Sequence, residues 1–309
     1  MIDIILSAYN GSSYIREQID SVLGSDQKDI RLFVFDDVSS DDTTEIVREF
    51  EQAEPGRVFL IKNAYNKGFC RNFIEGLEYV TAKYPADYYA FCDQDDVWFG
   101  DRPTICLENM KRAEDEVGRV VPVMLFTDAV LTDEKMCRLD NNFFKESRLN
   151  VNRLDLASEL MENKCIGCTS FMNHALASMI TGFDRRIRYH DWWAALTAAA
   201  FGKLIYVDRP TVMYRQHGNN QVGQTGFCEY ISSRADNIRD TRRRITQTIA
   251  QASAFHKQYS NLMSDENRRI VREFIALGRV GPIERRRLII KNRFYKSGLL
   301  RNLGILVVV

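Results

Sequence analysis

The first half of the chain alternates short apolar runs with longer stretches in which apolar residues recur at helical spacing. The apolar runs predict strands at 2–8, 31–36, 57–62 and 88–92. The periodic stretches between them predict helices at 13–23, 41–53 and 69–82. Strands that alternate with helices are typical of right-handed β-α-β units on a mostly parallel sheet, so this half predicts an α/β fold.

The pattern changes beyond residue 100. It predicts helices at 101–116, 153–163, 173–181 and 191–201, and strands at 120–126, 203–208 and 211–215. From residue 226 to the end it is helical and basic. We therefore expect a domain over 1–225, with halves of about 1–100 and 101–225, and a helical region over 226–309.

Composition and charge narrow the class of protein. The 309 residues are 45% hydrophobic and 27% charged, which excludes disordered, collagen-like and multi-span membrane chains. The 42 basic and 42 acidic residues give a net charge of zero, which argues against a general nucleic-acid binder. Residues 1–225 nevertheless hold 25 Lys and Arg against 35 Asp and Glu, whereas 226–309 hold 17 against 7. This asymmetry predicts two parts with different partners.

The seven cysteines show no repeating framework, which is typical of a reducing compartment. Cys165 and Cys168 form a single C-x-x-C, for which a redox pair, a zinc site and no special role are the alternatives. No signal peptide precedes the first predicted strand, and the apolar run at 303–309 is too short to span a bilayer. We expect a cytoplasmic protein, with or without peripheral contact with the inner face of the cell membrane.

Polar residues close four successive predicted strands. In an open α/β sheet, ligands bind beyond the carboxyl ends of the strands. A solvated turn or a helix cap accounts for any one of these ends, whereas four in succession predict a ligand site. The segments are Ser7-Ala8-Tyr9-Asn10, Asp36-Asp37, Asn63 with Asn66-Lys67-Gly68, and Asp93-Gln94-Asp95-Asp96.

The cluster of acids at 93–96 carries the sharpest chemical signal. Three carboxylates within four residues repel one another unless a cation or hydrogen-bond donors compensate them. Mg²⁺ and Mn²⁺ bind carboxylate oxygens together with substrate phosphates, so the cluster predicts a divalent metal site. The alternatives are an acidic loop that caps the helix near Asp101 and a phosphohydrolase, although the latter usually has its aspartates after the first strand.

Taken together, these motifs resemble those of family 2 glycosyltransferases of the GT-A fold, and most of all bacterial rhamnosyltransferases that build cell-wall and O-antigen polysaccharides. The resemblance covers residues 2–220 and implies a mixed, mostly parallel sheet flanked by helices, followed by a C-terminal helical region. Its motifs are Leu6–Gly11, Phe35–Asp41, Asn66–Phe69, Phe91–Trp98, His190–Trp193 and Tyr214–His217.

The resemblance implies a donor site. Asp93 and Asp95 match the D-x-D motif, in which Asp95 ligates the metal directly and Asp93 contacts the ribose, or the metal through water. His217 matches a further metal ligand, and Arg215 matches a contact to the diphosphate, with an ordinary surface ion pair as the alternative. The residues expected around the nucleotide itself are Ala8, Tyr9, Asp37, Asn66, Gly68 and Asn72.

The resemblance also implies a catalytic base. Asp191 matches the acid that removes the proton of the acceptor hydroxyl in inverting members, with a helix-capping acid as the alternative. His190 stands where many relatives have Glu, which leaves open whether it assists the base or fills space. Trp192 and Trp193 fit a sugar platform or the core. Val38 replaces a common Gly, so we expect a local difference in that loop.

The expected activity is therefore inverting, metal-dependent transfer of L-rhamnose from dTDP-L-rhamnose to a hydroxyl of a lipid-linked polysaccharide precursor, with Mn²⁺ or Mg²⁺. A UDP-hexose donor is the nearest alternative, and a non-catalytic glycan- or membrane-binding protein is a distant one. For the basic region at 226–309 the alternatives are a membrane surface, a solvated helical bundle that packs on the catalytic domain, and a homodimer contact; nucleic acid is not expected as a partner.

Overall fold

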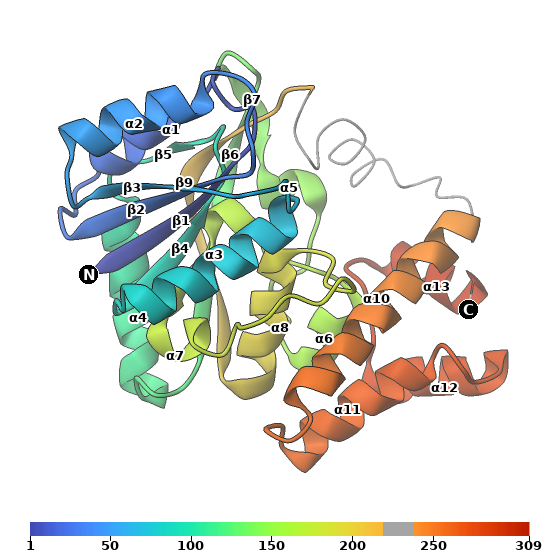
Figure 1. Cartoon of the computed structure of the whole chain (residues 1–309). Coiled ribbons are helices and arrows are strands. Elements are labelled where there is room, and N and C mark those ends of the chain that lie inside the picture. The colour runs from blue at the N-terminus through green and yellow to red at the C-terminus, as the bar shows by residue number, and fades with distance from the viewer. Residues whose placement is uncertain (219–237, 309) are drawn as a thin grey trace.

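The structure is a computed structural model that describes residues 1–218 and 238–308 (Figure 1). Helices cover a nine-stranded mixed sheet. The strands are β1 (Ile2–Ala8), β2 (Ile30–Asp36), β3 (Val58–Lys62), β4 (Tyr88–Cys92), β5 (Val97–Trp98), β6 (Val123–Thr132), β7 (Arg138–Asn142), β8 (Phe171–Asn173) and β9 (Lys203–Arg215). The helices before residue 219 are α1 (Ile15–Leu23), α2 (Thr43–Ala53), α3 (Phe69–Lys83), α4 (Arg102–Val117), α5 (Phe143–Ser147), α6 (Leu156–Met161), α7 (His174–Ala177) and α8 (His190–Phe201), with the 3-10 turn η1 (Gly167–Thr169).

The sheet has the strand order β3-β2-β1-β4-β8-β6-β9-β5, with β7 paired to β6. Strands β1 to β4 are parallel to their neighbours within this group, so their carboxyl ends meet at one edge. The first four predicted strands and the first four predicted helices are confirmed, with ends that shift by at most two residues. The α/β class of the N-terminal half is therefore confirmed.

The prediction was less successful beyond β4. Strand β8 pairs antiparallel with both β4 and β6, and the sequence analysis missed it, as it missed β5, β7 and α5. The predicted helix at 173–181 is reduced to the single turn of α7. The two predicted strands at 203–208 and 211–215 are one strand, β9, whose register against β6 shifts beside Pro210. Proline has no N–H to donate, so the run reads as two strands although the chain continues as one.

Helix α3 packs directly on the parallel strands β1 and β2 (Figure 1). Gly76 lies at this contact: a Cβ there would come within 3.0 Å of the Phe35 ring and 3.2 Å of Ile5. A larger residue would push α3 away from β1 and β2. The close approach places the loop between β3 and α3 beside the ends of these strands.

Within residues 238–308 the chain forms the helices α10 (Ile238–Tyr259), α11 (Asp265–Ala276), α12 (Pro282–Asn292) and α13 (Leu299–Val308). They lie beside α6 and α8, on the side of the molecule away from β2 and β3 (Figure 1). Phe255 and Tyr259 of α10 pack on Trp193 of α8, with ring centroids 5.2 and 5.9 Å from it. Glu162 accepts hydrogen bonds from the backbone and hydroxyl of Ser297, which ties the two parts together.

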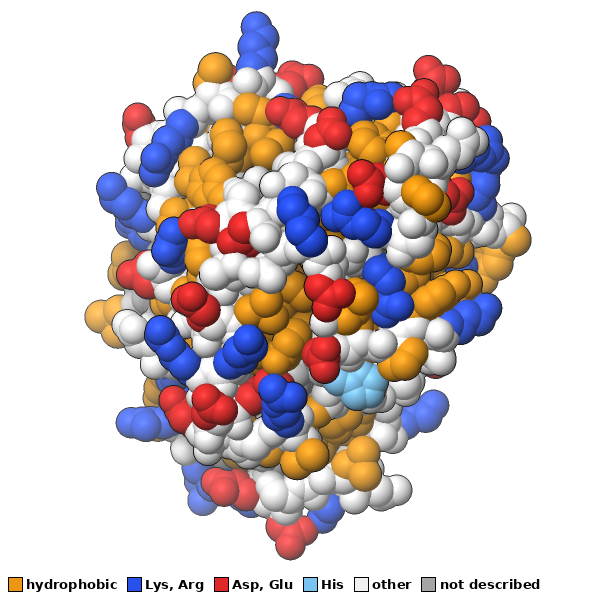
Figure 2. All heavy atoms as spheres, turned by 90° about the vertical axis from the view of Figure 1, so that its left-hand side faces the viewer, with side chains coloured by type: hydrophobic (Ala, Val, Ile, Leu, Met, Phe, Trp, Pro, Cys, Tyr) orange, Lys and Arg blue, Asp and Glu red, His pale blue; other side chains and the backbone are white. Residues whose placement is uncertain are grey.

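Part of the predicted helical region, 226–237, together with Cys228 and the proposed boundary at 225/226, lies outside the described residues. None of the described helices is both long and apolar enough to cross a bilayer. Figure 2 shows the face that lies on the left in Figure 1, where acidic and basic side chains are interspersed. The excess of basic residues belongs instead to the C-terminal part of the sequence.

Candidate active site

A cavity of about 1070 Å³ opens at the carboxyl ends of the parallel strands. Its walls come from the strand ends, from the start of α8 and from the C-terminal helices. The predicted site residues that line it are Tyr9, Asp37, Asn66, Gly68, Asp93, Asp95, Asp191 and His217. Ala8, Asn72 and Arg215 are not among its lining residues. The structure thus brings together side chains that are up to 208 positions apart in the sequence, from Tyr9 to His217.

The buried carboxylate of Asp37 organises one end of the cavity. Its Oδ1 accepts from the backbone N–H of Lys67 and from Asn63 Nδ2, both at 2.8 Å, and its Oδ2 accepts from the N–H of Gly68 at 2.8 Å. Asn66 Nδ2 donates to the Asp37 carbonyl at 2.9 Å. Asp37 therefore fixes the loop between β3 and α3, and it does so while lining the cavity.

The loop after β2 keeps a left-handed turn in spite of Val38. This residue has a φ of 68°, a conformation that costs a β-branched side chain about 1–2 kcal/mol. Val38 thus adopts the positive φ that β-branched residues disfavour, and the expected local difference of this loop from relatives stays a prediction. Its neighbour Ser39 donates its backbone N–H to the Asp36 carboxylate at 3.2 Å, which holds the turn.

Ala8 and Asn72 lie behind the cavity wall. Ala8 is fully buried, and Asn72 is 1% exposed. Asn72 Nδ2 donates to Ser7 Oγ at 2.7 Å and to the Phe35 carbonyl at 2.8 Å, so one side chain of α3 joins the ends of β1 and β2. In this structure these two residues position the wall, and the direct nucleotide contact expected of them stays a prediction.

The acidic loop after β4 meets the end of β9. Asp95 Oδ2 and His217 Nε2 are 2.8 Å apart, so the two predicted metal ligands face each other. The imidazole of His217 packs on the Tyr14 ring at 4.6 Å. A carboxylate and an imidazole that converge in a half-buried cavity are a donor set that Mn²⁺ accepts, so these side chains fit a divalent metal.

Arg215 holds this loop from behind. Its guanidinium donates to the carbonyls of Asp95 and Glu134, each at 2.7 Å, and forms an ion pair with Glu17 at 2.5 Å. The side chain lies over the Tyr14 ring and is almost fully buried. The structure therefore places Arg215 behind the acidic loop, and the predicted contact to a diphosphate stays untested.

Gln94 also lines the cavity, although the sequence analysis did not single it out. Its amide pairs with the backbone of Tyr9, with Oε1 accepting at 2.9 Å and Nε2 donating at 3.1 Å. A Cβ on Gly11 would approach Gln94 Oε1 to 2.2 Å, so Gly11 makes room for this bridge. The middle residue of the D-x-D motif therefore links the acidic loop to the end of β1.

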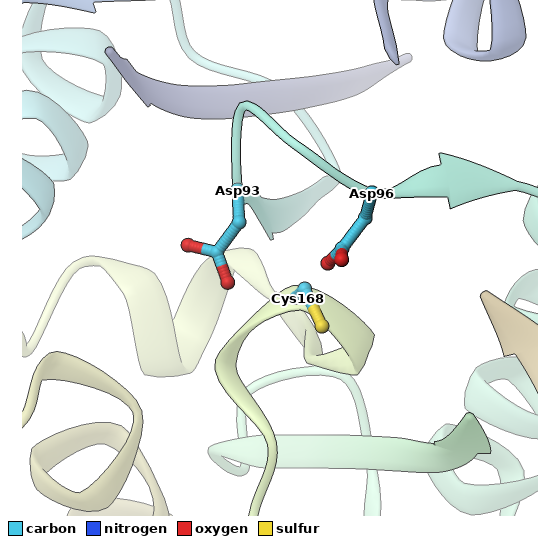
Figure 3. Close-up of side chains that lie close together, drawn as sticks. All are labelled: Asp93, Asp96 and Cys168. Carbon is cyan, nitrogen blue, oxygen red and sulfur yellow. The ribbon is translucent and has the colours of Figure 1, made fainter. Parts of the chain in front are cut away.

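Asp93, Asp96 and Cys168 also lie close together, with one ligand atom of each within 4.8 Å of the others (Figure 3). Asp96 is turned into the interior, where its Oδ1 accepts the backbone N–H of Arg215 at 3.1 Å. Burial raises the pKa of the Cys168 thiol well above its usual value, and Asp96 raises it further. In this structure the three side chains form a contact between the acidic loop and η1, in which Asp96 and Cys168 are buried.

The two cysteines of the C-x-x-C motif are buried free thiols. Burial raises the pKa of Cys165 as it does that of Cys168. Thiols without thiolate character are weak nucleophiles, so a redox pair is not supported here. Among the residues that the structure describes, Cys165 belongs to no cluster of three metal-ligating side chains, so a zinc site on this motif is not supported either.

Asp191 lies in the first turn of α8 and faces the cavity. It is 8% exposed, and burial raises the pKa of its carboxyl to about 6. Asn163 Nδ2 donates to its Oδ2 at 3.1 Å, and the N–H of Trp192 donates to its Oδ1 at 2.7 Å. These bonds fix the carboxylate, and its raised pKa suits proton transfer near neutral pH.

His190 is packed in an aromatic box. Its ring stacks on Phe73 at 3.9 Å and meets the edge of Phe91 at 4.7 Å. Burial lowers the pKa of its imidazole to about 3, so the ring is neutral. This packing supports the first turn of α8, and His190 also lines the cavity beside Asp191, so assistance to the base stays a prediction.

The adjacent tryptophans have different surroundings. Trp193 is fully buried in the contact between α8 and α10. Trp192 lines the cavity, and its Nε1 donates to the carbonyl of Glu159 at 2.7 Å. Only Trp192 is therefore placed to contact a ligand.

Comparison with known proteins assigns the chain to a protein family. The family model described as Glycosyl transferase family 2 matches residues 3–164, which is just over half of the chain. The chain belongs to glycosyl transferase family 2. This family 2 chain is thus a transferase rather than the phosphohydrolase or the non-catalytic binding protein that the sequence left open.

Two characterised glycosyltransferases are similar in sequence to this family 2 chain. The dTDP-rhamnosyl transferase RfbG of Shigella flexneri is 27% identical over 232 residues, which cover 71% of this chain and 73% of RfbG. The Escherichia coli enzyme UDP-Glc:alpha-D-GlcNAc-diphosphoundecaprenol beta-1,3-glucosyltransferase WfaP is 33% identical over 98 residues, or 32% of this chain and 36% of WfaP.

A solved structure shows the same fold. The mannosyltransferase PcManGT from Pyrobaculum calidifontis, in complex with GDP-Man and Mn²⁺, superposes with a TM-score of 0.54 at 16% identity. The superposition covers 94% of this chain and 79% of that one. The family 2 chain therefore has the GT-A fold, as predicted, followed by C-terminal helices.

Proposed function

We propose that this glycosyltransferase is an inverting, metal-dependent enzyme that transfers a sugar from a nucleotide diphosphate to a hydroxyl of a lipid-linked polysaccharide precursor. One observation carries the proposal: the carboxylate of Asp191 lines the same cavity as the facing pair Asp95 and His217. A base and a cation site in one cavity are suited to transfer from a diphosphate donor, because one activates the acceptor and the other stabilises the leaving group.

Asp191 acts as the general base. Its carboxylate accepts the proton of the acceptor hydroxyl, and the oxygen attacks the anomeric carbon of the donor. The bond from that carbon to the diphosphate breaks on the opposite face, and the leaving diphosphate takes its electron pair, so the configuration inverts. General-base assistance of this kind contributes about 10²–10⁴-fold to the rate.

Asp95 and His217 would hold Mn²⁺ or Mg²⁺, and Asp93 lies in the same loop. A bound divalent ion supplies Lewis-acid compensation of the charge on the leaving diphosphate. Two features support this assignment: the 2.8 Å approach of the two side chains, and the presence of Mn²⁺ in the PcManGT complex of the same fold. Arg215 and Gln94 position the loop that carries the ligands.

The donor we favour is dTDP-L-rhamnose, because the rhamnosyltransferase RfbG aligns over most of the chain. Tyr9, Asp37, Asn66 and Gly68 line the nucleotide end of the cavity. A UDP-hexose is the second candidate, since WfaP uses UDP-Glc and aligns with a shorter part of the sequence.

A transfer assay tests the proposal. dTDP release from dTDP-rhamnose, in the presence of a bacterial lipid extract as acceptor, should require Mn²⁺ and stop when EDTA is added. UDP-glucose in the same assay separates the two donors. The variant Asp115→Asn is the control, because this acid is exposed on α4, away from the cavity. Release of either nucleotide at an unchanged rate in EDTA would contradict the metal-dependent mechanism.

The C-terminal helices provide a surface suited to the membrane. On α12, Ile283, Arg287 and Ile290 are exposed and recur at helical spacing, so they share one face. Leu299 and Leu300, at the start of α13, are 75% and 83% exposed. Apolar side chains beside cations are what an anionic lipid surface binds, so we propose peripheral contact through α12 and α13.

Flotation with lipid vesicles tests this contact. The protein should float with vesicles that contain phosphatidylglycerol, and the double variant Leu299→Ser/Leu300→Ser should float less. Analytical ultracentrifugation of the same proteins examines the homodimer alternative. Self-association that the double variant abolishes, without any flotation, would assign the surface to a dimer contact instead.

A further inference from the structure

The end of the cavity formed by the C-terminal helices contains two arginines. Arg188 precedes α8, and Arg244 lies on α10; both line the cavity that also holds Asp191. Figure 1 shows α10 on the far side of the fold from β2 and β3, whose loops form the nucleotide end. The two cations therefore belong to the acceptor side of the cavity.

Arg188 is held firmly by neutral groups. Its Nη1 donates to Thr248 Oγ1 at 2.9 Å, and its backbone N–H donates to Gln251 Oε1 at 2.8 Å. Its guanidinium also lies over the Trp192 ring, 5.2 Å from the centroid. Thr248 and Gln251 lie one and two turns beyond Arg244 on α10, so a single face of that helix sets the position of Arg188.

Among the side chains that the structure describes, no carboxylate forms an ion pair with Arg188, whose guanidinium contacts Thr248 and the rings of Tyr189 and Trp192. Burial lowers the pKa of its guanidinium, and the nearby Arg244 lowers it further. Glu162, an acid in the same wall, already accepts from Ser297 at 2.6 Å and pairs with Arg301 at 3.3 Å. A desolvated guanidinium is costly unless an anion binds it.

We propose that Arg188, with Arg244 beside it, binds a phosphate or diphosphate group of the acceptor. A guanidinium fork matches phosphoryl oxygens, and its fixed position on Thr248 and Trp192 avoids the cost of ordering it. Phe274 and Ile245 line the same end of the cavity and give an attached hydrocarbon chain an apolar wall. The site would hold the acceptor by its anionic group while Asp191 meets its hydroxyl.

This inference rests on the proposed function, because it names the acceptor side of the same cavity. The proposed acceptor site and the donor site are formed by different residues. The donor diphosphate is assigned to the end of the cavity with Asp95 and His217, whereas Arg188 belongs to the wall made with α10. The two sites are therefore separable by variants and by competition.

Calorimetry on the full chain tests the site. The enzyme is first saturated with dTDP and Mn²⁺ so that the donor site is filled, and farnesyl diphosphate is then titrated as the probe. Arg188→Gln should weaken farnesyl diphosphate binding about tenfold or more, because a charge-assisted contact is lost. Arg188→Lys should retain part of the affinity. Inorganic diphosphate, titrated in parallel, shows how much of the binding depends on the hydrocarbon chain.

Arg186→Gln is the matched control. Arg186 lies two residues earlier, pairs with Asp184 at 2.6 Å and does not line the cavity. It should leave the binding of both diphosphates unchanged. Equal affinity of wild type and Arg188→Gln for farnesyl diphosphate would overturn the proposal. So would a parallel loss of dTDP binding in Arg188→Gln, since Arg188 would then serve the donor. Failure of the wild type to bind any nucleotide with Mn²⁺ would instead contradict the proposed function itself.

Discussion

The two ends of the cavity are built in different ways. The end proposed to bind the nucleotide consists of short loops after successive parallel strands, joined by hydrogen bonds such as those of Asp37 and Gln94. The end proposed to bind the acceptor is formed by side chains from distant segments, such as Arg188 before α8 and Thr248 on α10. The first end is an integral part of the sheet, whereas the second depends on the packing of the C-terminal helices. Donor binding and transfer should therefore respond to different substitutions.

The largest expected effect separates chemistry from donor binding. Asp191→Asn removes the base but keeps the size of the side chain, so kcat should fall about 10²–10⁴-fold. The affinity for dTDP with Mn²⁺ should stay within about twofold of wild type. Steady-state kinetics and calorimetry on the same preparation check this. A variant that retains wild-type kcat would remove Asp191 from the mechanism.

The next effect tests whether the acceptor end depends on helix packing. Phe255→Ala removes a fully buried ring from the contact with Trp193, and the unfolding free energy should fall by about 3–5 kcal/mol. Urea denaturation measures the change, with the exposed Leu262→Ala as its control. At temperatures where the variant is folded, dTDP binding should persist, because the nucleotide end does not contact Phe255. A specific loss of dTDP binding would break the distinction between the two ends.

The pH dependence offers a smaller, graded test of the same catalytic step. Because burial raises the pKa of Asp191 to about 6, its carboxyl is protonated below that pH and cannot accept a proton. The value of kcat/KM should be flat above about pH 6 and fall tenfold per unit below it. Profiles are measured at saturating Mn²⁺, to keep the metal site filled. A profile that is flat down to pH 4.5 would be incompatible with Asp191 as the base.

The smallest expected effect is a change in stability from a substitution in the loop after β2. Val38→Asn replaces a β-branched residue at a φ of 68° by one that tolerates this conformation, so stability should rise by about 0.5–1 kcal/mol. The control is Val120→Asn, at an exposed valine with ordinary φ, which should not gain stability. Denaturation midpoints compare the two. A gain in neither variant would mean that the turn carries no strain.

The same contrast explains what the sequence could predict. The first four strands and the polar residues at their ends follow from local periodicity, because each element pairs with its sequence neighbours or lies close to them. Asp37, Asp95 and Asp191 could be predicted as site residues since short motifs carry them. His217 could be predicted too, although its contact with Asp95 spans 122 positions.

Other features depend on long-range contacts with no local signal. Strand β8 is three residues long and is a strand only because β4 and β6 flank it. Arg215 was expected at the diphosphate, yet nothing in its sequence neighbourhood indicates that Glu17 and Glu134 would hold it behind the acidic loop. Arg188 likewise depends on α10, some 60 residues later. For Gln94 the sequence did hold a signal, because this residue stands between Asp93 and Asp95 in the acidic motif.

The most direct test of the account is calorimetric binding of dTDP, UDP and GDP, each with and without Mn²⁺, to wild type and to Asp95→Asn. The account predicts metal-dependent binding of dTDP in preference to the others, and loss of the metal dependence in Asp95→Asn but not in Asp115→Asn. Preference for UDP would assign a hexose donor. Absence of binding by any nucleotide, with or without metal, would contradict the assignment of this cavity as a donor site.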